Sequence, residues 1–243
     1  MLIINADDWG GWKSATDAAL KCFKKGRITS VTAMVFMEDS ERAATLARET
    51  GVDVGLHLNL DTPFTSGTCP ERVRRRHEPV CRWLRSTRYS QLVYNPFLCG
   101  NFRDLYEVQV AEFARLYGRK PSHIDGHHHM HLCANMLWEK VVPSNERIRR
   151  NFSFWPGEKS SFNRLYRGFV DKRLARCYRT TDYFFSLSRC LDSQRAARVE
   201  KLAGTSNVEL MTHPEKTEEY NWLMGDEASA LVSRLKLCSY AQL

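Results

Sequence analysis

The sequence lacks any apolar run that approaches the roughly 18 residues needed to cross a lipid bilayer. It also lacks the basic start and long apolar stretch of a secretory signal, because it begins MLIINADD. None of the eight cysteines forms a CxxC pair, so zinc-finger spacing is absent and reduced thiols are expected. These absences predict a cytoplasmic protein without a membrane span.

Short apolar runs alternate with helical patterns along the 243 residues. The expected strands cover residues 2–6, 28–37, 52–60, 122–125 and 208–212. The expected helices cover residues 13–25, 40–49, 103–117 and 193–202. Strands separated by helices predict parallel βαβ units, and the length fits a single α/β domain over residues 1–243.

Two stretches do not follow this alternation. Residues 62–100 contain proline and many arginines, and are expected to form an irregular insertion. Residues 151–191 are aromatic and basic, and the pattern assigns no elements there.

The net charge of +8 has a large contribution from one group of arginines. They are Arg72, Arg74, Arg75, Arg76, Arg82, Arg85 and Arg88. The simpler interpretation is a solvated face, and the alternative is a patch that attracts nucleic acid or a phosphorylated glycan carrier. No nucleic-acid-binding motif supports a nucleic-acid partner.

Ionisable residues follow four of the expected strands. In parallel α/β folds the carboxyl ends of the strands lie on one face, which carries the active site. Asp7 and Asp8 follow the first strand, and His57 lies at the end of the third. His123 and Asp125 of the fourth strand are followed by His127, and His213 follows the last. We therefore expect these side chains to converge.

Asp7 and Asp8 are adjacent, so on an extended backbone they would point to opposite sides. A bend at Gly10 and Gly11 would direct both toward one site, where one could bind a cation and the other take a proton. The alternative is a helix N-cap. For His57 the alternative is a hydrogen-bonded core histidine, and for His213 it is a turn residue whose backbone Pro214 restricts.

The segment SHIDGHHHMH, residues 122–131, is more specific. It contains five histidines in nine positions, and imidazole is a common ligand of transition metals. One ion cannot bind all five, so some of them, with Asp125, are expected to orient the ligands or contact substrate. The histidines are His123, His127, His128, His129 and His131.

Taken together, these motifs resemble the YdjC-like carbohydrate deacetylases, which include the chitooligosaccharide type. The matching stretches are residues 4–10, 26–32, 55–60, 119–131 and 209–214, in the family's order and over almost the whole chain. The resemblance implies a distorted (β/α) TIM-like barrel with parallel strands. It also implies an N-acetylated sugar as substrate, acetate as product, and a homodimer by analogy.

The resemblance further implies one divalent ion, Mg²⁺ or Zn²⁺, held by Asp8, His57 and His127. Asp7 would then be the general base and His213 the general acid. Asn59, on the side of the strand that carries His57, is expected to bind substrate or support the ligands.

This sequence departs from the family pattern in two places. Trp9 stands where the family usually has phenylalanine, and Asp61-Thr62-Pro63 replaces a Thr-x-Gly-x-Pro continuation. These differences concern the identity of the glycan more than the reaction.

Two other functions fit the same residues. Two histidines and a carboxylate also form the iron site of non-haem oxygenases, although those enzymes usually have a jelly-roll fold. A non-catalytic glycan-binding module is the other alternative.

Overall fold

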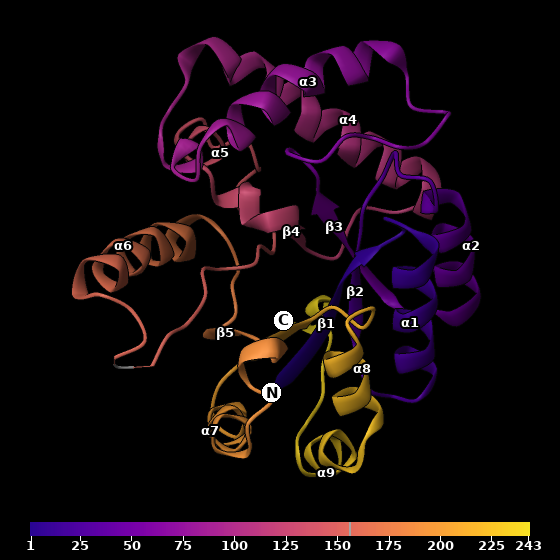
Figure 1. Ribbon diagram of the computed structural model, residues 1–243, viewed down its shortest axis with the longest axis vertical. Helices are drawn as coiled ribbons and strands as arrows, with labels where there is room; N and C mark the ends of the chain where they lie inside the picture. Colours follow the sequence, from indigo (N-terminus) through magenta and orange to yellow (C-terminus); the bar gives the residue numbers. More distant parts are fainter. Residues whose placement is uncertain (156) are drawn as a thin grey trace.

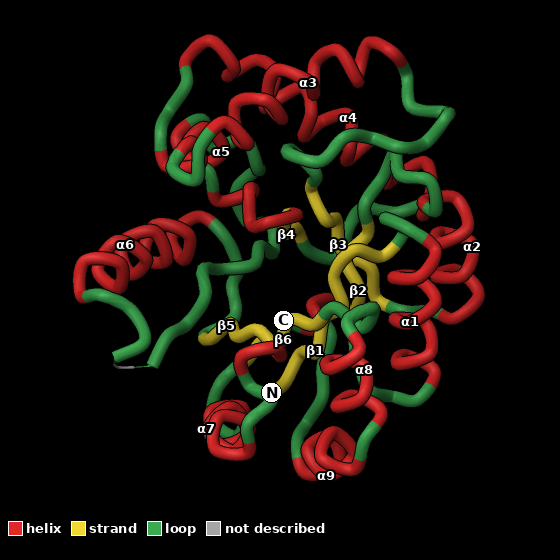
Figure 2. Tube along the Cα trace, viewed as in Figure 1, coloured by secondary structure: helices red, strands yellow, loops and turns green. Residues whose placement is uncertain are grey.

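The computed structural model describes residues 1–155 and 157–243, and its centre is a parallel sheet of six strands in the order β4-β3-β2-β1-β6-β5. The strands curl into a half-barrel with helices outside, which is a distorted TIM-like barrel (Figures 1 and 2). The expected fold class is confirmed. The strands are β1 (Leu2–Trp9), β2 (Ser30–Ala33), β3 (Asp53–Leu58), β4 (Ile124–Gly126), β5 (Tyr183–Ser186) and β6 (Val208–Thr212).

The helices follow the strands in the order that βα units require. They are α1 (Lys13–Lys24), α2 (Ser40–Thr50), α3 (Glu71–Ser86), α4 (Cys99–Tyr117), α5 (Ala134–Trp138), α6 (Ser161–Cys177), α7 (Ser193–Ala203), α8 (Thr217–Met224) and α9 (Asp226–Arg234). Helices α2 and α4 each end at a glycine with positive φ, Gly51 and Gly118, as the sequence predicted.

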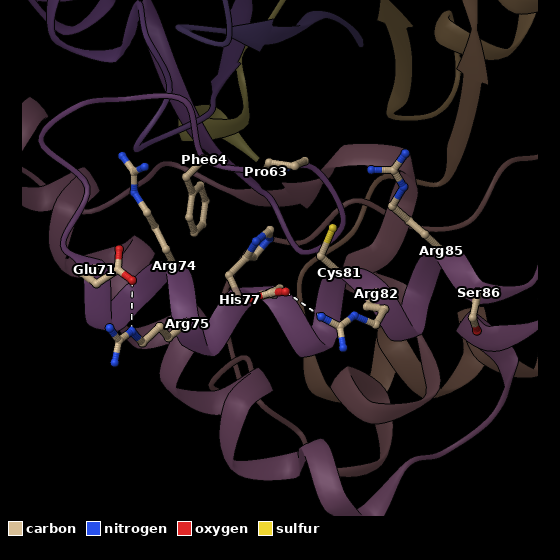
Figure 3. Close-up of a pocket in the computed structure, with 11 residues that line it drawn as sticks. Pro63, Phe64, Glu71, Arg74, Arg75, His77, Cys81, Arg82, Arg85 and Ser86 are labelled. Carbon is tan, nitrogen blue, oxygen red and sulfur yellow. Dashed lines mark hydrogen bonds and ion pairs between the residues drawn. The ribbon is translucent and has the colours of Figure 1, made fainter.

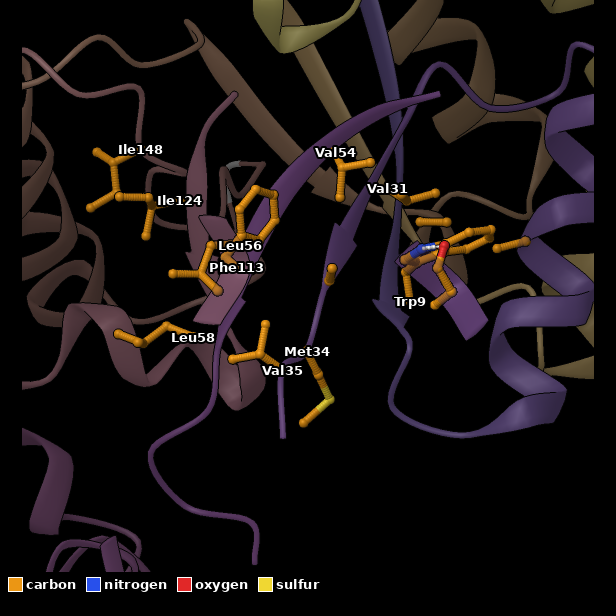
Figure 4. Packing of buried hydrophobic residues seen from close by; sticks show 14 of the residues in the cluster. Trp9, Val31, Met34, Val35, Val54, Leu56, Leu58, Phe113, Ile124 and Ile148 are labelled. Atoms are coloured by element: carbon orange, nitrogen blue, oxygen red, sulfur yellow. Dashed lines mark hydrogen bonds between the residues drawn. The ribbon is translucent and has the colours of Figure 1, made fainter. Parts of the chain in front are cut away.

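The barrel core is built from strand residues that are buried on both faces, as expected for a parallel sheet. Val31, Val54 and Leu56 are fully buried, and Phe113 of α4 packs near Leu56 (Figure 4). On the other side, the Trp9 indole donates a hydrogen bond to the Ala43 carbonyl of α2 at 3.2 Å.

The sheet is open between β4 and β5, and residues 147–149 lie in this gap. Ile148 forms a bridge with Ile124 of β4, and Arg147 forms one with Arg179 just before β5. The backbone of the gap segment therefore completes the wall, and it places Arg149 inside the barrel, where it is fully buried.

The predicted irregular insertion at residues 62–100 is wrong in part, because α3 occupies residues 71–86 and α4 begins at Cys99. Pro79 lies inside α3, and an internal proline removes a helix hydrogen bond, so it argued against a helix. The helical spacing of Val73, Val80 and Leu84, all buried, was the signal that outweighs it.

Other boundaries also differ. The second strand covers residues 30–33 rather than 28–37, and β1 continues through Asp7 and Asp8 to Trp9. In the unassigned stretch 151–191 the structure has α6 and β5. No described helix is long and apolar enough to cross a membrane.

Gly55 supplies the first test of this packing. A Cβ atom built on Gly55 would overlap the buried His123 ring, which itself stacks on Tyr240 at 3.7 Å. We expect Gly55→Ala to lower the free energy of unfolding by about 1–3 kcal/mol, measured by urea denaturation. Gly100→Ala is the control, because a Cβ there meets nothing within 4 Å, and an unchanged stability of Gly55→Ala would contradict this packing.

Candidate metal centre

The carboxyl ends of the strands surround a cleft of about 550 Å³. The sequence prediction that Asp7, Asp8, His57, His127 and His213 converge agrees with this arrangement, since all five line the cleft. The other lining residues are Trp12, Gly126, His128, His129, Met211, Glu215 and Lys216.

A local irregularity in β1 brings both aspartates to this cleft. The register of β1 against β2 shifts between Ala6 and Trp9, and Asp8 has a left-handed φ of 64°. A non-glycine residue in this region is strained, and such strain is often found at functional sites. The expected bend at Gly10 and Gly11 therefore begins earlier, at Asp8 itself, and Gly10 continues it with φ of 79°.

Asp8, His57 and His127 form a compact, buried group of possible ligands. One carboxylate oxygen, Oδ1 of Asp8, lies 3.2 Å from Nε2 of His57 and 2.9 Å from Nδ1 of His127. Ligands of one Zn²⁺-like ion, each at about 2.0–2.1 Å from the metal, are separated by roughly 3 Å. The spacing of these three atoms therefore fits one cation.

Asp125 fixes the orientation of His57. Its Oδ1 lies 2.8 Å from Nδ1 of His57, and a carboxylate can only accept there, so Nδ1 donates. In the neutral ring this leaves the lone pair on Nε2, which faces Asp8. A carboxylate–histidine pair of this kind commonly holds a metal-binding imidazole in place.

Arg149 binds three carboxylates near the group formed by Asp8, His57 and His127. Its guanidinium binds Asp7 through two hydrogen bonds of 2.7 Å, and it lies 2.6 Å from Oδ2 of Asp125. It also donates to Glu209 at 2.8 Å, and Glu209 accepts from the Tyr240 hydroxyl. All of these side chains are buried, so one cation is shared by three carboxylates.

The contacts between Asp8, the histidines and the nearby carboxylates shift the pKa values of Asp8 and His57 in opposite directions. Burial raises the pKa of the Asp8 carboxyl, but hydrogen bonds from His127 and His57 outweigh it and hold the pKa well below its usual value. Burial lowers the pKa of His57, yet the charges of Asp125 and Asp7 hold that pKa well above its ordinary value. The same field that retains a proton on His57 would attract a metal cation.

A second set of possible ligands consists of Asp7, His57 and Asp125, whose ligand atoms also lie within 4.8 Å of one another. However, Asp7 and Asp125 already bind the Arg149 guanidinium. A metal ion there would lie beside a fixed positive charge, whereas Asp8 has no arginine within ion-pair distance in the described chain. The donor chemistry therefore favours the set of Asp8, His57 and His127.

His213 lies on the solvent-facing side of the group formed by Asp8, His57 and His127. Its Nε2 is 3.7 Å from Oδ2 of Asp8, and its side chain is 17% exposed, so it can reach a molecule in the cleft. Glu219 of α8 fixes its backbone by accepting a hydrogen bond of 2.8 Å from the His213 amide.

The turn η3 (His127–Leu132) separates the remaining histidines, because His128 and His129 both have positive φ. Nδ1 of His128 lies 2.7 Å from Asp61, and this side chain is 62% exposed. His129 packs edge-on against Phe152 at 4.6 Å. His131 donates to the Arg149 carbonyl at 3.1 Å, so it supports the arginine rather than the cleft.

Two candidates lie away from the cleft. His123 precedes β4 and stacks on Tyr240 at 3.7 Å, so its place is in the packing at the other end of the strand. The Asn59 side chain bonds to the backbone of Thr62 in both directions, at 2.7 and 2.9 Å. Asn59 thus shapes the loop that carries Asp61.

Residues 1–234 match the family described as YdjC-like protein. The chain belongs to this family. It is 34% identical over 227 residues to the chitooligosaccharide deacetylase of Serratia marcescens, covering 88% of this chain and 81% of that one. It is 27% identical over 240 residues to the human carbohydrate deacetylase, covering 88% and 74%.

A solved structure has the same fold. The crystal structure of a candidate cellobiose-phosphate cleavage protein from Enterococcus faecalis V583 matches with a TM-score of 0.69, covering 99% of this chain and 97% of the other. The sequence identity is 19%, so this likeness concerns the fold alone.

Two further cavities of this YdjC-like protein differ in their relation to the cleft. One, of about 520 Å³, begins at His128 and His129 and extends between Tyr89 and Tyr166. The other, of about 670 Å³, lies along α3 and shares no lining residue with the cleft (Figure 3). The second is lined by Pro63, Phe64, His77 and Cys81, with arginines and glutamates of α3 around them.

The arginines at residues 72–88 are largely a solvated helix face in the described structure. Arg75 pairs with Glu71 at 3.0 Å and Arg82 with Glu78 at 2.6 Å, in each case one turn apart. These pairs agree with the simpler of the two interpretations.

Sequence reasoning missed Arg149, Glu209 and Glu219. A charged residue within the apolar strand VELMT was a usable signal for Glu209, because buried charges are rare without a partner. Arg149 lies in a run of arginines, RIRR, in which nothing distinguishes a buried member from exposed ones.

We expect His57→Ala and His127→Ala each to lose the bound divalent metal, because each removes one of three ligand atoms. Metal content of the purified variants by mass spectrometry measures this. His128→Ala is the matched control, since its ring binds Asp61 instead, and it should retain the metal. Full occupancy in either ligand variant would remove that residue from the site.

We expect Arg149→Met to lower the free energy of unfolding by about 3–5 kcal/mol, because it leaves three buried carboxylates without their cation. The neighbouring Arg150→Met breaks one partly exposed pair with Asp171 and should cost about 1 kcal/mol or less. Urea denaturation of both variants tests the difference. Equal losses would show that Arg149 has no special role in the interior.

Proposed function

We propose that this protein is a metal-dependent hydrolase that removes the acetyl group from an N-acetylated sugar or oligosaccharide. The observation that carries the proposal is the convergence of three ligand atoms with a carboxylate and an imidazole in one cleft. Membership of the YdjC-like family, whose relatives above are named as deacetylases, supports the same reaction.

The donor set suits a divalent transition metal. Two imidazole nitrogens and one carboxylate are typical for Zn²⁺ or a similar ion, whereas Mg²⁺ prefers oxygen ligands. We therefore favour Zn²⁺ over Mg²⁺. When bound, the ion would supply a Lewis acid for the amide carbonyl and for the attacking water.

We assign the role of general base to Asp7, which would take the proton of that water. Its Oδ1 already accepts from Arg149, Asn5 and Thr32, while Oδ2 accepts only from Arg149 among the described residues. Oδ2 therefore retains an acceptor site. The bound guanidinium also fixes the carboxylate plane, so proton transfer needs no reorientation of Asp7.

We assign the role of general acid, at the other end of the reaction, to His213. Water oxygen bonds to the acyl carbon, the carbon–nitrogen bond breaks, and the amine must gain a proton as it departs. A protonated His213 at the mouth of the cleft can donate that proton. Acetate and a free amino sugar are the products.

The oxygenase alternative loses support, since its usual jelly roll is not the fold observed. Iron-dependent oxygen consumption would restore it. A non-catalytic glycan-binding module would instead bind acetylated sugars without ever releasing acetate. The assay that decides is acetate release from N-acetylated mono-, di- and lipid-linked sugars, with single metals returned after chelation. No acetate with any metal would reject the proposal.

Two variants separate the proton-transfer roles. We expect His213→Ala to lower the rate on an N-acetyl sugar by about 10²–10⁴ but to act far less on an activated acetate ester, whose leaving group departs unaided. Asp7→Asn should impair both substrates, because both need the base. Both variants should keep the metal. Equal losses on amide and ester for His213→Ala, with metal and fold unchanged, would exclude it as the acid.

A further inference from the structure

The exposed large apolar side chains gather on one part of the molecule. Among the described residues, all of them lie in segment 89–97, at Trp138, or between residues 165 and 169. The most exposed are Phe97 at 92%, Leu165 at 74%, Trp138 at 69% and Phe169 at 67%. Scattered single exposed apolar residues are ordinary, but a contiguous group marks an interaction surface.

These segments adjoin one another. The Asn135 amide of α5 donates to the Asn95 carbonyl at 2.8 Å, which ties α5 to segment 89–97. At the end of α5, the Trp138 ring lies 5.8 Å from the Arg173 guanidinium of α6. Helices α5 and α6 are neighbours in Figure 1. We name the surface formed by Phe97, Trp138 and the outer side of α6 the α6 face.

The outer side of α6 is both apolar and basic. Leu165, Phe169, Lys172 and Arg176 follow helical spacing and share one side, and all four are exposed. Leu174, on the opposite side, is fully buried. The side of α6 that faces solvent therefore carries both apolar and basic side chains.

The charge of this helix is not compensated locally. Residues 161–177 contain five arginines or lysines and one acid, Asp171. Asp171 pairs with Arg150 at 2.7 Å, so it does not neutralise the outer side. Helix α3 differs, because Arg75 and Arg82 pair with glutamates and none of its described residues is an exposed large apolar one.

Because the α6 face is cationic as well as apolar, a second copy of this protein is not the occupant that fits it best. In a symmetric dimer the same patch meets itself, so α6 would bring its positive charges against those of its copy. An anionic bilayer surface satisfies both properties, since apolar side chains insert at the headgroup level and basic ones attract the lipid charge. We propose that the α6 face docks this protein on an anionic membrane surface.

Docking on a membrane also limits which substrates reach the cleft. This step rests on the proposed function. The cavity that begins at His128 and His129 has Tyr166 and Val170 of α6 on one wall, and Tyr89 and Leu92 on the other. The cavity thus lies between segment 89–97 and α6, both of which contribute to the α6 face. An acetylated sugar attached to a lipid is then the substrate class that reaches the cleft from the membrane.

Vesicle co-sedimentation tests the docking. The wild type should bind vesicles of phosphatidylcholine with phosphatidylglycerol, bind pure phosphatidylcholine far less, and detach in high salt. Leu165→Ser with Phe169→Ser should weaken binding about tenfold or more. Lys172→Gln with Arg176→Gln should also weaken it about tenfold, whereas the matched pair Arg75→Gln with Arg82→Gln on α3 should not.

Three results would overturn the docking. They are a wild type that stays in the supernatant, an equal loss for the α3 pair, and a wild-type dimer that Leu165→Ser with Phe169→Ser dissociates on size exclusion. The last would identify the α6 face as a subunit interface.

Acetate release separates this inference from the proposed function. Leu165→Ser with Phe169→Ser should leave turnover of a soluble acetylated sugar unchanged and reduce turnover of the same sugar anchored in vesicles about tenfold. Equal turnover of the anchored sugar by wild type and variant would reject the substrate class. A wild type that binds vesicles but releases no acetate from either form would reject the function and leave the docking standing.

Discussion

The buried guanidinium of Arg149 is the constraint on which the interior depends. Asp7, Asp125 and Glu209 come from three different strands, and each contacts this one side chain. Burial lowers the pKa of Arg149, but the three carboxylates outweigh it and hold the pKa well above its ordinary value. The arginine therefore stays charged, and carboxylates that would repel one another remain within a single barrel.

One positive charge cannot neutralise three carboxylates equally. Burial raises the pKa of Glu209 to about 7, despite its bonds to Arg149 and Tyr240. Asp125 behaves in the opposite way: the charges of Arg149 and His57 outweigh burial and lower its pKa. Glu209 can thus hold a proton near neutral pH, while Asp125 keeps the negative charge that orients His57.

This division of charge leaves Asp8 as the carboxylate available for an external cation. Its partners are the imidazoles of His57, His127 and, more distantly, His213, and the first two offer the ring nitrogens that a metal needs. The left-handed backbone at Asp8 directs this side chain away from Arg149 and Asp7 toward the histidines. Neighbouring aspartates therefore take different tasks because the backbone separates them.

The sequence predicted those parts of the site that follow regular strands. His57 and Asp7 were found because parallel strands place their carboxyl ends together, and SHIDGHHHMH was too rich in histidine for packing alone. Arg149 was not predicted because it lies in the irregular segment between β4 and β5. In such a segment no periodicity of apolar residues distinguishes buried side chains from exposed ones. The bend at Asp8 was not predicted either. Glycine is the usual residue with positive φ, and Gly10 and Gly11 follow nearby, so the bend was expected there.

Anomalous X-ray scattering from crystals grown with Zn²⁺ or Mn²⁺, recorded at the absorption edge of the metal, tests the central claim most directly. We expect one peak within about 2.0–2.2 Å of the Asp8 carboxylate and of ring nitrogens of His57 and His127. A peak between Asp7, His57 and Asp125, or none in the cleft, would contradict the account.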